Sequence, residues 1–465
     1  MSTKAFIPEL LSPAGSIKNM QYAFAYGADA VYAGQPRYSL RVRNNEFNHD
    51  NLALAISQAH QLNKKFYVVN NIAPHNIKLQ TFVKDLSPVV QMQPDAFIMS
   101  DPGLISLAKE AFPELEIHLS VQANAVNWAT VKFWQQQGIK RVILSRELSI
   151  NEIEEIRQQC PDIELEVFVH GALCMAYSGR CLLSGYINKR DPNQGTCTNA
   201  CRWQYNAHSA TENLDGHIIP TQSIEPTLGS GEPSQDIFLL QEQGRPDEYM
   251  PAFEDEHGTY IMNSKDLRAV QHVQKLIDIG VDSLKIEGRT KSFYYCARTA
   301  QVYKQAIMDA VKGKPFNPNL MDELENLAHR GYTEGFLRRH VHDEYQNYQQ
   351  GHSVSTKQQF VGEVISCNSD GLVEIAVKNK FLVGDDLELM TPDGNFKFNL
   401  AHMQNRKGEM ITDAKGSGHT VLIKIPHEIK PEFAILVRDL PENSDTRQPF
   451  PAKNESNENL AYPVK

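Results

Sequence analysis

RVILSRELSINEIEEIRQQCPDIELEVFVHG, residues 141–171, is the stretch that decides the fold. It begins and ends with a short apolar run, and each run has the length of a buried strand. Between the runs, Ser149 and Glu152 form an S-x-x-E capping box, and Leu148 and Ile153 occupy the two hydrophobic staple positions of a helix N-terminus. The stretch therefore predicts a strand, a helix and a second strand.

The same rhythm recurs along the chain. The apolar runs are PELLSP (8–13), AVYAG (30–34), KFYVVNNI (65–72), AFIMSD (96–101), EIHLSVQ (116–122), RVILSRE (141–147), ELEVFVHG (164–171) and SLKIEGR (283–289). Amphipathic stretches with helical spacing separate the first seven. Eight strands with helical crossovers predict an α/β fold, a TIM-like (β/α)8 barrel. The alternative is an open doubly wound sheet. The barrel is favoured because no G-x-G-x-x-G follows the first strand.

The rest of the chain divides around this barrel. About 110 residues separate the seventh and eighth runs, far more than an ordinary connection. We expect a barrel over residues 1–350, with an insertion over 171–282 that forms an irregular lobe or lid, and a helical segment to about residue 350. From residue 356 to 440, short alternating runs with PDG and GSG turns predict a small antiparallel β-domain. Residues 441–465 are expected to form a flexible tail.

Composition places limits on function. The chain is 41% hydrophobic and 22% charged, which is typical of a soluble globular protein. No apolar run is long enough to span a membrane and no signal peptide is evident, so a cytoplasmic protein without membrane contact is expected. The net charge of -10 argues against general coating of nucleic acid but permits a local basic surface. In a reducing compartment, clustered cysteines favour metal binding over disulfides.

Four cysteines follow the seventh run with the spacing C-x6-C-x15-C-x3-C: Cys174, Cys181, Cys197 and Cys201. Four thiolates suit either an iron–sulfur cluster or a structural zinc ion, and the spacing leaves both open. A third hypothesis is a nucleophilic Cys174 with His170 as its base. It is less favoured because it leaves three neighbouring thiols unexplained.

Polar residues also gather near the predicted strand C-termini, where barrel enzymes place their sites. They are Glu9, Asn70, Asn71, Asp101, Gln122, Arg146, Glu147, His170, Lys285, Glu287 and Arg289. Arg37, Arg41 and Arg43 follow the second run, and guanidinium groups suit bidentate carboxylate binding. The pattern indicates a site for a small, anionic ligand.

Several blocks carry a family resemblance. EVFVHGALC (166–174), GRCLLS (179–184), LSVQANAVNWATVKFW (119–134) and SGYINKRDPNQGTCTNACRW (184–203) are long and rich in rare residues. They resemble the collagenase-like proteins filed as peptidase family 32 of unassigned type. Within that family, the chain is similar to the bacterial prephenate-dependent tRNA uridine hydroxylases over about residues 7–440.

The resemblance implies a specific activity. Such proteins convert the wobble uridine of tRNA to 5-hydroxyuridine without O2, and they depend on prephenate and on a [4Fe–4S] cluster. The implied cluster ligands are Cys174, Cys181, Cys197 and Cys201. The implied partners are a tRNA anticodon stem-loop, prephenate or a related anionic metabolite, and an electron donor.

We assign residue roles on this basis. The candidate catalytic residues are His170, Glu166, Gln122 and Lys285, and the candidate substrate-binding residues are Arg41, Arg43, Asn71 and Arg289. Two alternative functions remain: a collagenase-like cysteine peptidase, and a non-catalytic factor that delivers iron–sulfur electrons or tRNA.

Overall fold

The protein was analysed as a computed structural model. It describes residues 6–35, 37–40, 46–173, 265–329, 331–338, 357–368, 371–426 and 430–440, and the backbone of six strands between residues 205 and 259. Arg41, Arg43, the four clustered cysteines and the predicted tail at 441–465 lie outside these residues, so the predictions for them remain predictions.

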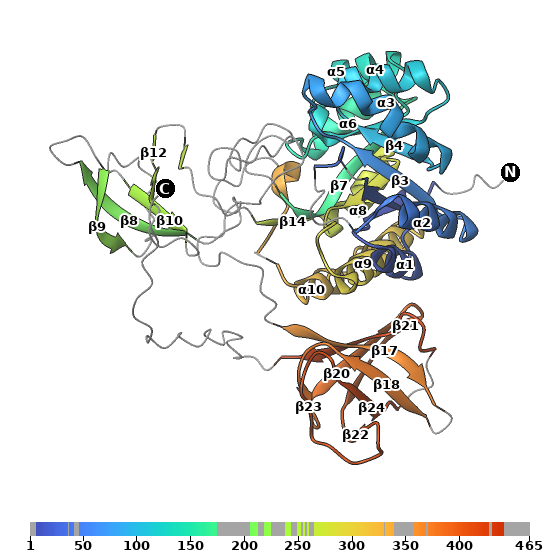
Figure 1. Cartoon of the computed structure of the whole chain (residues 1–465), viewed down its shortest axis with the longest axis vertical. Coiled ribbons are helices and arrows are strands. Elements are labelled where there is room, and N and C mark those ends of the chain that lie inside the picture. Colours follow the sequence, from blue (N-terminus) through green and yellow to red (C-terminus); the bar gives the residue numbers. More distant parts are fainter. Residues whose placement is uncertain are drawn as a thin grey trace, which may run out of the picture.

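Eight parallel strands close into a barrel (Figure 1). Strand β1 pairs with both β2 and β15, and β15 also pairs with β7, so the sheet has no free edge at this point. This closure confirms the predicted TIM-like fold and excludes the open sheet. The strands are β1 (Glu9–Pro13), β2 (Ala30–Gly34), β3 (Lys65–Asn70), β4 (Ala96–Met99), β5 (Ile117–Leu119), β6 (Arg141–Ile143), β7 (Glu164–Ala172) and β15 (Ser283–Ile286).

Helices follow the strands and cover the outside of the barrel (Figure 1). Most begin at a residue whose side chain accepts a hydrogen bond from the backbone of the first turn; Ser16, Asp101 and Ser292 do this. The predicted capping box of Ser149 and Glu152 is present. The helices are α1 (Ile17–Ala25), α2 (His49–Gln61), α3 (Asn76–Gln91), α4 (Pro102–Ala111), α5 (Trp128–Gln136), α6 (Ile150–Gln159), α8 (Val273–Ile279), α9 (Phe293–Val311) and α10 (Asn319–Glu325).

Strand β7 is longer than its neighbours, and its partners along the two edges differ: β14 and β15 lie on opposite sides of it, since His170 is paired with a residue of each. Its first half pairs with β15, and its second half pairs antiparallel with β14 (Asp266–Arg268). The register with β15 shifts by one residue, so that Lys285 lies opposite Phe168 but Ile286 lies opposite His170. This bulge reverses the side-chain alternation beyond Phe168. The chain leaves the barrel after β7 and returns through β14.

The insertion contains more regular structure than the sequence predicts. Strands β8 (Tyr205–Glu212), β9 (Ile218–Ile224), β10 (Phe238–Glu242) and β11 (Tyr249–Ala252) form an antiparallel sheet in the order β11-β10-β8-β9. The short strands β12 (Glu254–Asp255) and β13 (Gly258–Thr259) pair with each other. The expected irregular lobe therefore includes a sheet, which the Gly- and Pro-rich composition concealed.

A small antiparallel β-domain follows the barrel. Its main sheet has the order β21-β20-β25-β17-β18-β24-β22, and β19 pairs with β23. The strands are β17 (Gln358–Cys367), β18 (Leu372–Val377), β19 (Phe381–Leu382), β20 (Asp386–Thr391), β21 (Gly394–Asn399), β22 (Met403–Asn405), β23 (Asp413–Ala414), β24 (Thr420–Lys424) and β25 (Ile435–Asp439). The helical segment expected to run to about residue 350 is interrupted: α10 ends at Glu325, and β16 (Tyr332–Thr333) joins β14, while residues 339–350 lie outside the described part of the chain.

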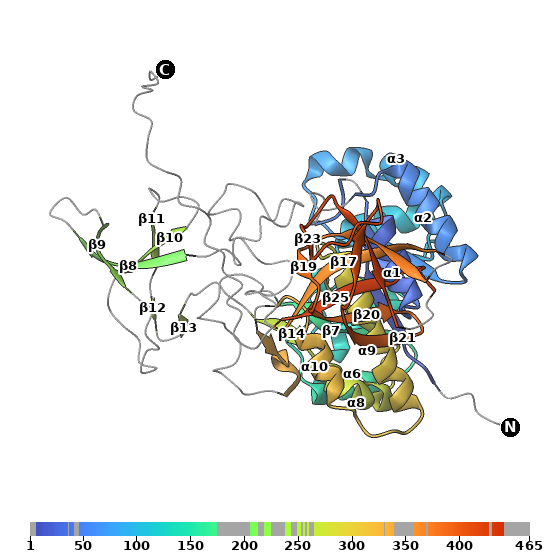
Figure 2. The same ribbon diagram turned by 90° about the horizontal axis from the view of Figure 1, so that it is seen from below.

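The β-domain packs against α1 and α9 (Figures 1 and 2). Met390, Ile435 and Val437 belong to the same buried apolar cluster as the barrel. Arg298 of α9 is fully buried at this contact and forms ion pairs with Glu323 and Glu388. The β-domain has a core of its own, and it also meets the barrel through a buried, mainly apolar contact.

Candidate functional site at the C-terminal end of the barrel

The lower half of the barrel interior holds a buried charged network. Arg141 lies 2.6 Å from Glu9 and 3.1 Å from Glu166, and Lys285 Nζ lies 2.7 Å from Glu166 Oε1. The Tyr67 hydroxyl donates to Glu9 at 2.7 Å. Burial alone raises the pKa of Glu9, but the Arg141 guanidinium holds that pKa below its usual value. The network is balanced in charge and is buried as a unit.

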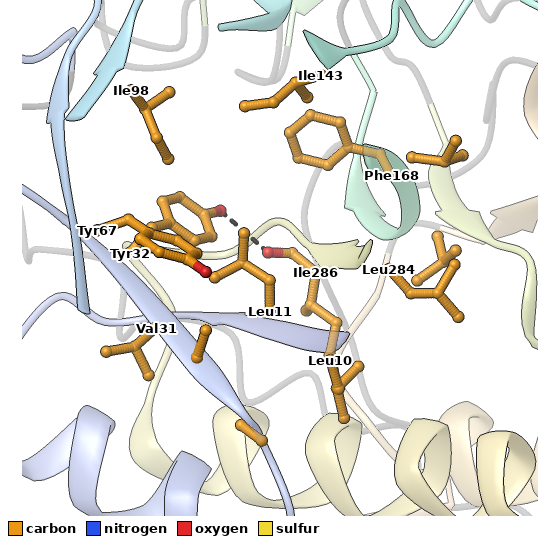
Figure 3. Packing of buried hydrophobic residues seen from close by; sticks show 14 of the residues in the cluster. Leu10, Leu11, Val31, Tyr32, Tyr67, Ile98, Ile143, Phe168, Leu284 and Ile286 are labelled. Carbon is orange, nitrogen blue, oxygen red and sulfur yellow. Dashed lines mark hydrogen bonds between the residues drawn. The ribbon is translucent and has the colours of Figure 1, made fainter. Parts of the chain in front are cut away.

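Above this network, aromatic rings fill the middle of the barrel. Tyr32 and Phe168 lie there with Leu11, Ile98 and Ile143 (Figure 3). The Lys285 ammonium lies 4.3 Å from the centre of the Tyr32 ring and 5.3 Å from that of Phe168. Burial lowers the pKa of Lys285, and the neighbouring Glu166 opposes this shift. Lys285 is thus a buried cation whose proton is held less tightly than usual.

The rim on the β2 and β15 side carries Arg289 and Glu287. Arg289 Nη1 donates to Ser39 Oγ at 2.8 Å, and its guanidinium lies 5.6 Å from the Tyr32 ring centre. The Tyr32 hydroxyl donates to Glu287 Oε2 at 2.9 Å. All of these residues are buried, so the guanidinium is held in a fixed position by its surroundings.

Polar groups from β3, β5 and β6 complete the rim. Asn71 Nδ2 donates to Ser120 Oγ at 3.3 Å, and Ser120 begins the short 3-10 turn (Val121–Ala123) that contains Gln122. Gln122 Oε1 is buried and has no hydrogen-bond partner in the described chain. The Arg146 guanidinium lies 4.4 Å from the Phe168 ring centre. A buried acceptor without a partner costs free energy, which favours a ligand at this end.

His170 lies elsewhere. Beyond the bulge its ring turns to the helix side of β7, where Tyr295, Tyr303 and Tyr332 surround it with ring centres 5.4 to 5.8 Å away. It is 1% exposed, and burial lowers its pKa to about 3. The ring is therefore neutral and enclosed, and it does not face the barrel mouth that the sequence hypothesis assigned to it.

The structure brings together only part of the sequence-predicted set. Asn71, Gln122, Lys285 and Arg289 gather in or above the barrel, and Glu166 lies beneath Lys285. Glu9 is the first residue of β1, so its expected position near a strand C-terminus is wrong. Asp101 caps α4, and Arg37 pairs with Asp85 of α3 at 2.7 Å.

Sequence reasoning missed Arg141, Tyr32 and Tyr67. The sequence carried a signal for Arg141. It precedes Ile143 by two residues, and residues two apart in a strand point to the same face of the sheet, so the two side chains are expected on one face. The same period places a charged residue inside several apolar runs, as with Glu166 and Lys285. These charges predict an ionic barrel interior once the barrel is accepted.

A closed (β/α)8 barrel with cationic and amide side chains at its C-terminal end, fixed to a small β-domain, defines a barrel protein suited to a small polar ligand. The sequence comparisons place it more closely. The chain belongs to peptidase family U32: residues 15–347 match the description "Peptidase family U32", and residues 356–438 match "Peptidase family U32 C-terminal domain".

Relatives of known name support this assignment. The chain is 68% identical over 450 residues to "tRNA hydroxylation protein P" of Escherichia coli K12, covering 96% of this chain and 99% of that protein. It is 67% identical to the protein of the same name from Haemophilus influenzae, with the same coverage. It is 30% identical to the "23S rRNA 5-hydroxycytidine C2501 synthase" of Escherichia coli, covering 82% of this chain and 52% of that protein. These matches confirm the resemblance inferred from the motifs.

Two further observations concern the membrane and metal hypotheses. Within the described residues, no helix has the length and apolar character needed to cross a membrane. The same part of the chain contains no cluster of three or more His, Cys, Asp or Glu side chains arranged for a metal ion.

Proposed function

We propose that this protein is a tRNA-modifying enzyme of the cytoplasm that forms 5-hydroxyuridine at the wobble position, without O2 and with prephenate as co-substrate. The observation that carries the proposal is the 68% identity to a tRNA hydroxylation protein across 96% of the chain. The similarity to an rRNA 5-hydroxycytidine synthase supports hydroxylation of a pyrimidine base as the shared chemistry.

The barrel mouth suits this reaction. Replacing C5–H of uracil by C5–OH is a two-electron oxidation that adds an oxygen atom, so the reaction needs both an electron acceptor and an oxygen donor in addition to the base. Arg289, fixed by Ser39 and Tyr32, would hold a carboxylate of the co-substrate. Asn71 and Gln122 would hydrogen-bond the polar edge of a uridine extruded from the anticodon loop, because chemistry on a base requires it to leave the stack.

Lys285 and Glu166 would handle the proton. Lys285 Nζ lies between the two rings beneath the mouth, and burial lowers its pKa. It would donate a proton to an oxygen that gains negative charge in the reaction, and Glu166 would hold it in position. Tyr32 and Phe168 would exclude water from beneath the ligand.

The clustered cysteines would hold the [4Fe–4S] cluster. The described cysteines lie apart, with Cys160 at the end of α6, Cys296 inside α9 and Cys367 at the end of β17. Strand β7 ends at Ala172, and in the sequence the first of the other four cysteines follows two residues later. Four thiols are the donor set that such a cluster takes, and when bound it supplies one-electron chemistry. The assigned ligands are Cys174, Cys181, Cys197 and Cys201.

The position of His170 disfavours the peptidase alternative. A cysteine nucleophile needs a base within hydrogen-bond reach that can accept its proton. His170 is enclosed by three tyrosines, and its pKa of about 3 makes it a poor proton acceptor near neutral pH. Apart from the name of the family, no side-chain arrangement among the described residues favours peptide cleavage.

The test is nucleoside mass spectrometry of tRNA from cells that lack this protein, complemented with wild type or with Cys174→Ala. We expect loss of 5-hydroxyuridine and its derivatives, with restoration by wild type only. Cys296→Ala is the matched control and should restore the nucleoside, because this thiol is buried inside α9. Any parallel route is deleted in the same strain.

Unchanged levels of 5-hydroxyuridine and its derivatives in that strain would refute the proposed hydroxylase function. Purified protein that forms the nucleoside from prephenate and tRNA would exclude a delivery factor. Iron content of anaerobically purified protein, measured for wild type and Cys174→Ala, separates the cluster from zinc.

A further inference from the structure

Arg146 differs from most of the described arginines in what balances its charge. Arg141, Arg157 and Arg298 each lie within ion-pair distance of a carboxylate. Arg146 instead lies 4.4 Å from the Phe168 ring centre and donates through Nη1 to the carbonyl of Ala172. Among the residues that the structure describes, no carboxylate pairs with it.

These contacts hold the guanidinium without neutralising it. An aromatic ring attracts a cation through its quadrupole, and a carbonyl attracts it through a dipole, but neither carries a net charge. The Nη2 and Nε donors of Arg146 are left available on a half-buried, oriented group. Such a group is suited to bidentate binding of an oxyanion.

Arg146 also belongs to a continuous series of contacts across the barrel mouth. It contacts Phe168, Phe168 contacts Lys285, Lys285 contacts Tyr32, and Tyr32 contacts Arg289. The two guanidinium groups are thus the two ends of this series of contacts, and the buried Lys285 ammonium lies within it. A ligand with a single anionic group would use only one end.

We propose that Arg146 binds a carboxylate of the small co-substrate, and that together with Arg289 it makes the barrel mouth selective for a dicarboxylate. This inference rests on the proposed function and adds a specificity residue to it. A small ligand is favoured over an RNA phosphate because Arg146 lies over Phe168, a ring of the barrel interior, rather than on the outer surface.

The test is calorimetric binding of prephenate, which carries two carboxylates, and of phenylpyruvate, which carries one, to the full-length protein. Wild type is expected to bind prephenate more tightly. Arg146→Gln should weaken prephenate binding about 10- to 100-fold, the range expected for loss of a charge-assisted hydrogen-bond pair. Arg146→Lys keeps the charge but loses the planar fork, so we expect an intermediate loss. Arg406→Gln, an exposed arginine of the β-domain, is the matched control and should change nothing.

Phenylpyruvate then assigns the carboxylate. If Arg146→Gln leaves the affinity for phenylpyruvate unchanged, Arg146 holds the carboxylate that phenylpyruvate lacks. If the variant loses as much affinity for phenylpyruvate as for prephenate, Arg146 holds the carboxylate that both ligands share. Both outcomes support the proposal when thermal unfolding shows that the variant is folded.

Other outcomes would overturn it. If Arg146→Gln binds prephenate as wild type does but binds tRNA more weakly with a smaller salt dependence, Arg146 contacts RNA phosphate. If neither ligand is affected, Arg146 has only a structural role and the proposed function stands. If wild type binds no prephenate, the prephenate part of the proposed function fails together with this inference.

Discussion

At the scale of single residues, the buried Lys285 and Glu166 are the pair whose energetics can be measured most directly. Both are almost completely enclosed, and Lys285 has one carboxylate partner in the described ion pairs, whereas Glu166 is shared with Arg141. A buried charge that loses its partner is left uncompensated in a medium of low dielectric constant. The cost of losing one partner therefore exceeds the cost of losing both.

We expect Glu166→Gln to lower the free energy of unfolding by about 3–5 kcal/mol, because it leaves the buried Lys285 ammonium without its carboxylate. Lys285→Met should cost less, because Glu166 keeps its ion pair with Arg141. The double variant should cost less than the sum of the two, because it also removes the ammonium that Glu166→Gln leaves unpaired. Urea unfolding of the four proteins, followed by circular dichroism, gives the coupling energy. Additivity within about 0.5 kcal/mol would show that the two groups are energetically independent.

His170 gives a prediction in pH. Its pKa is about 3 in the folded protein and about 6.5 in an unfolded chain, so the unfolded state binds the extra proton between these values. Above pH 6.5, His170 is neutral in both states and does not oppose folding. As the pH falls from 6.5 toward 3, protonation of His170 in the unfolded state lowers the free energy of unfolding by about 1.4 kcal/mol per pH unit. In His170→Phe, which keeps a ring among the three tyrosines, this part of the slope should vanish. Urea unfolding at pH 5 and pH 7 measures it, and identical slopes in variant and wild type would contradict the assigned pKa.

The residue scale also shows what could be read from sequence. The rim positions of Asn71, Gln122 and Arg289 follow from their places after apolar runs, and the structure puts them there. His170 follows such a run too, yet the bulge before it turns the ring to the helix side. A one-residue register shift leaves no mark in the hydrophobic pattern, so it could not be foreseen.

At the scale of elements, the end of β7 depends on a glycine. Gly171 has φ +103°, and a Cβ at this position would lie 2.3 Å from the carbonyl oxygen of Glu287. That close approach brings the strand against the segment that carries Glu287 and Arg289. The glycine therefore controls the geometry of the rim as well as the turn of the backbone.

Gly171→Ala should therefore destabilise the protein more than an ordinary substitution at positive φ. Gly313 is the matched control, because it has φ +69° and open space around its Cβ position. We expect Gly313→Ala to cost about 1–2 kcal/mol from the left-handed backbone alone. Gly171→Ala should cost about 1–3 kcal/mol more from the steric conflict. Thermal unfolding compares the two, and equal shifts would mean that Glu287 moves aside freely.

Helices and strands with a clear hydrophobic period could be predicted from the sequence. Strands that form only because a distant strand pairs with them could not. The eight barrel strands and their capped helices follow from apolar runs and from cap residues such as Ser149. Strand β14 is three residues long and depends on the second half of β7 for its hydrogen bonds. The insertion sheet likewise depends on partners far along the chain, which local pattern does not reveal.

At the scale of the whole molecule, the contact between barrel and β-domain contains a buried cation as well as apolar residues. Arg298 reaches from α9 to Glu388 of β20 at 3.0 Å, and Gln358 donates to the other oxygen of that carboxylate at 2.7 Å. Tyr294 stacks on Phe360 beside it. The sequence predicts both parts but not this contact, because nothing local marks Arg298 among the other charges of its helix.

Arg298→Met should destabilise the protein by about 3–5 kcal/mol, because Glu388 is left buried without its cation. Lys397→Met, which breaks an exposed pair with Asp439, is the control and should cost less than about 1 kcal/mol. Calorimetry should show the unfolding of the β-domain separating from that of the barrel in Arg298→Met. A single transition that shifts no further than in the control would show that the apolar contact alone joins the two parts.

The pairing of β7 with β14 has a consequence for assembly. Ala172 lies opposite Asp266, so the two ends of the long insertion are fastened together by the barrel itself. Bringing the ends of a long loop together normally lowers chain entropy, and here that ordering accompanies the folding of the barrel. We therefore expect the barrel still to close when a short turn between β7 and β14 replaces the intervening segment.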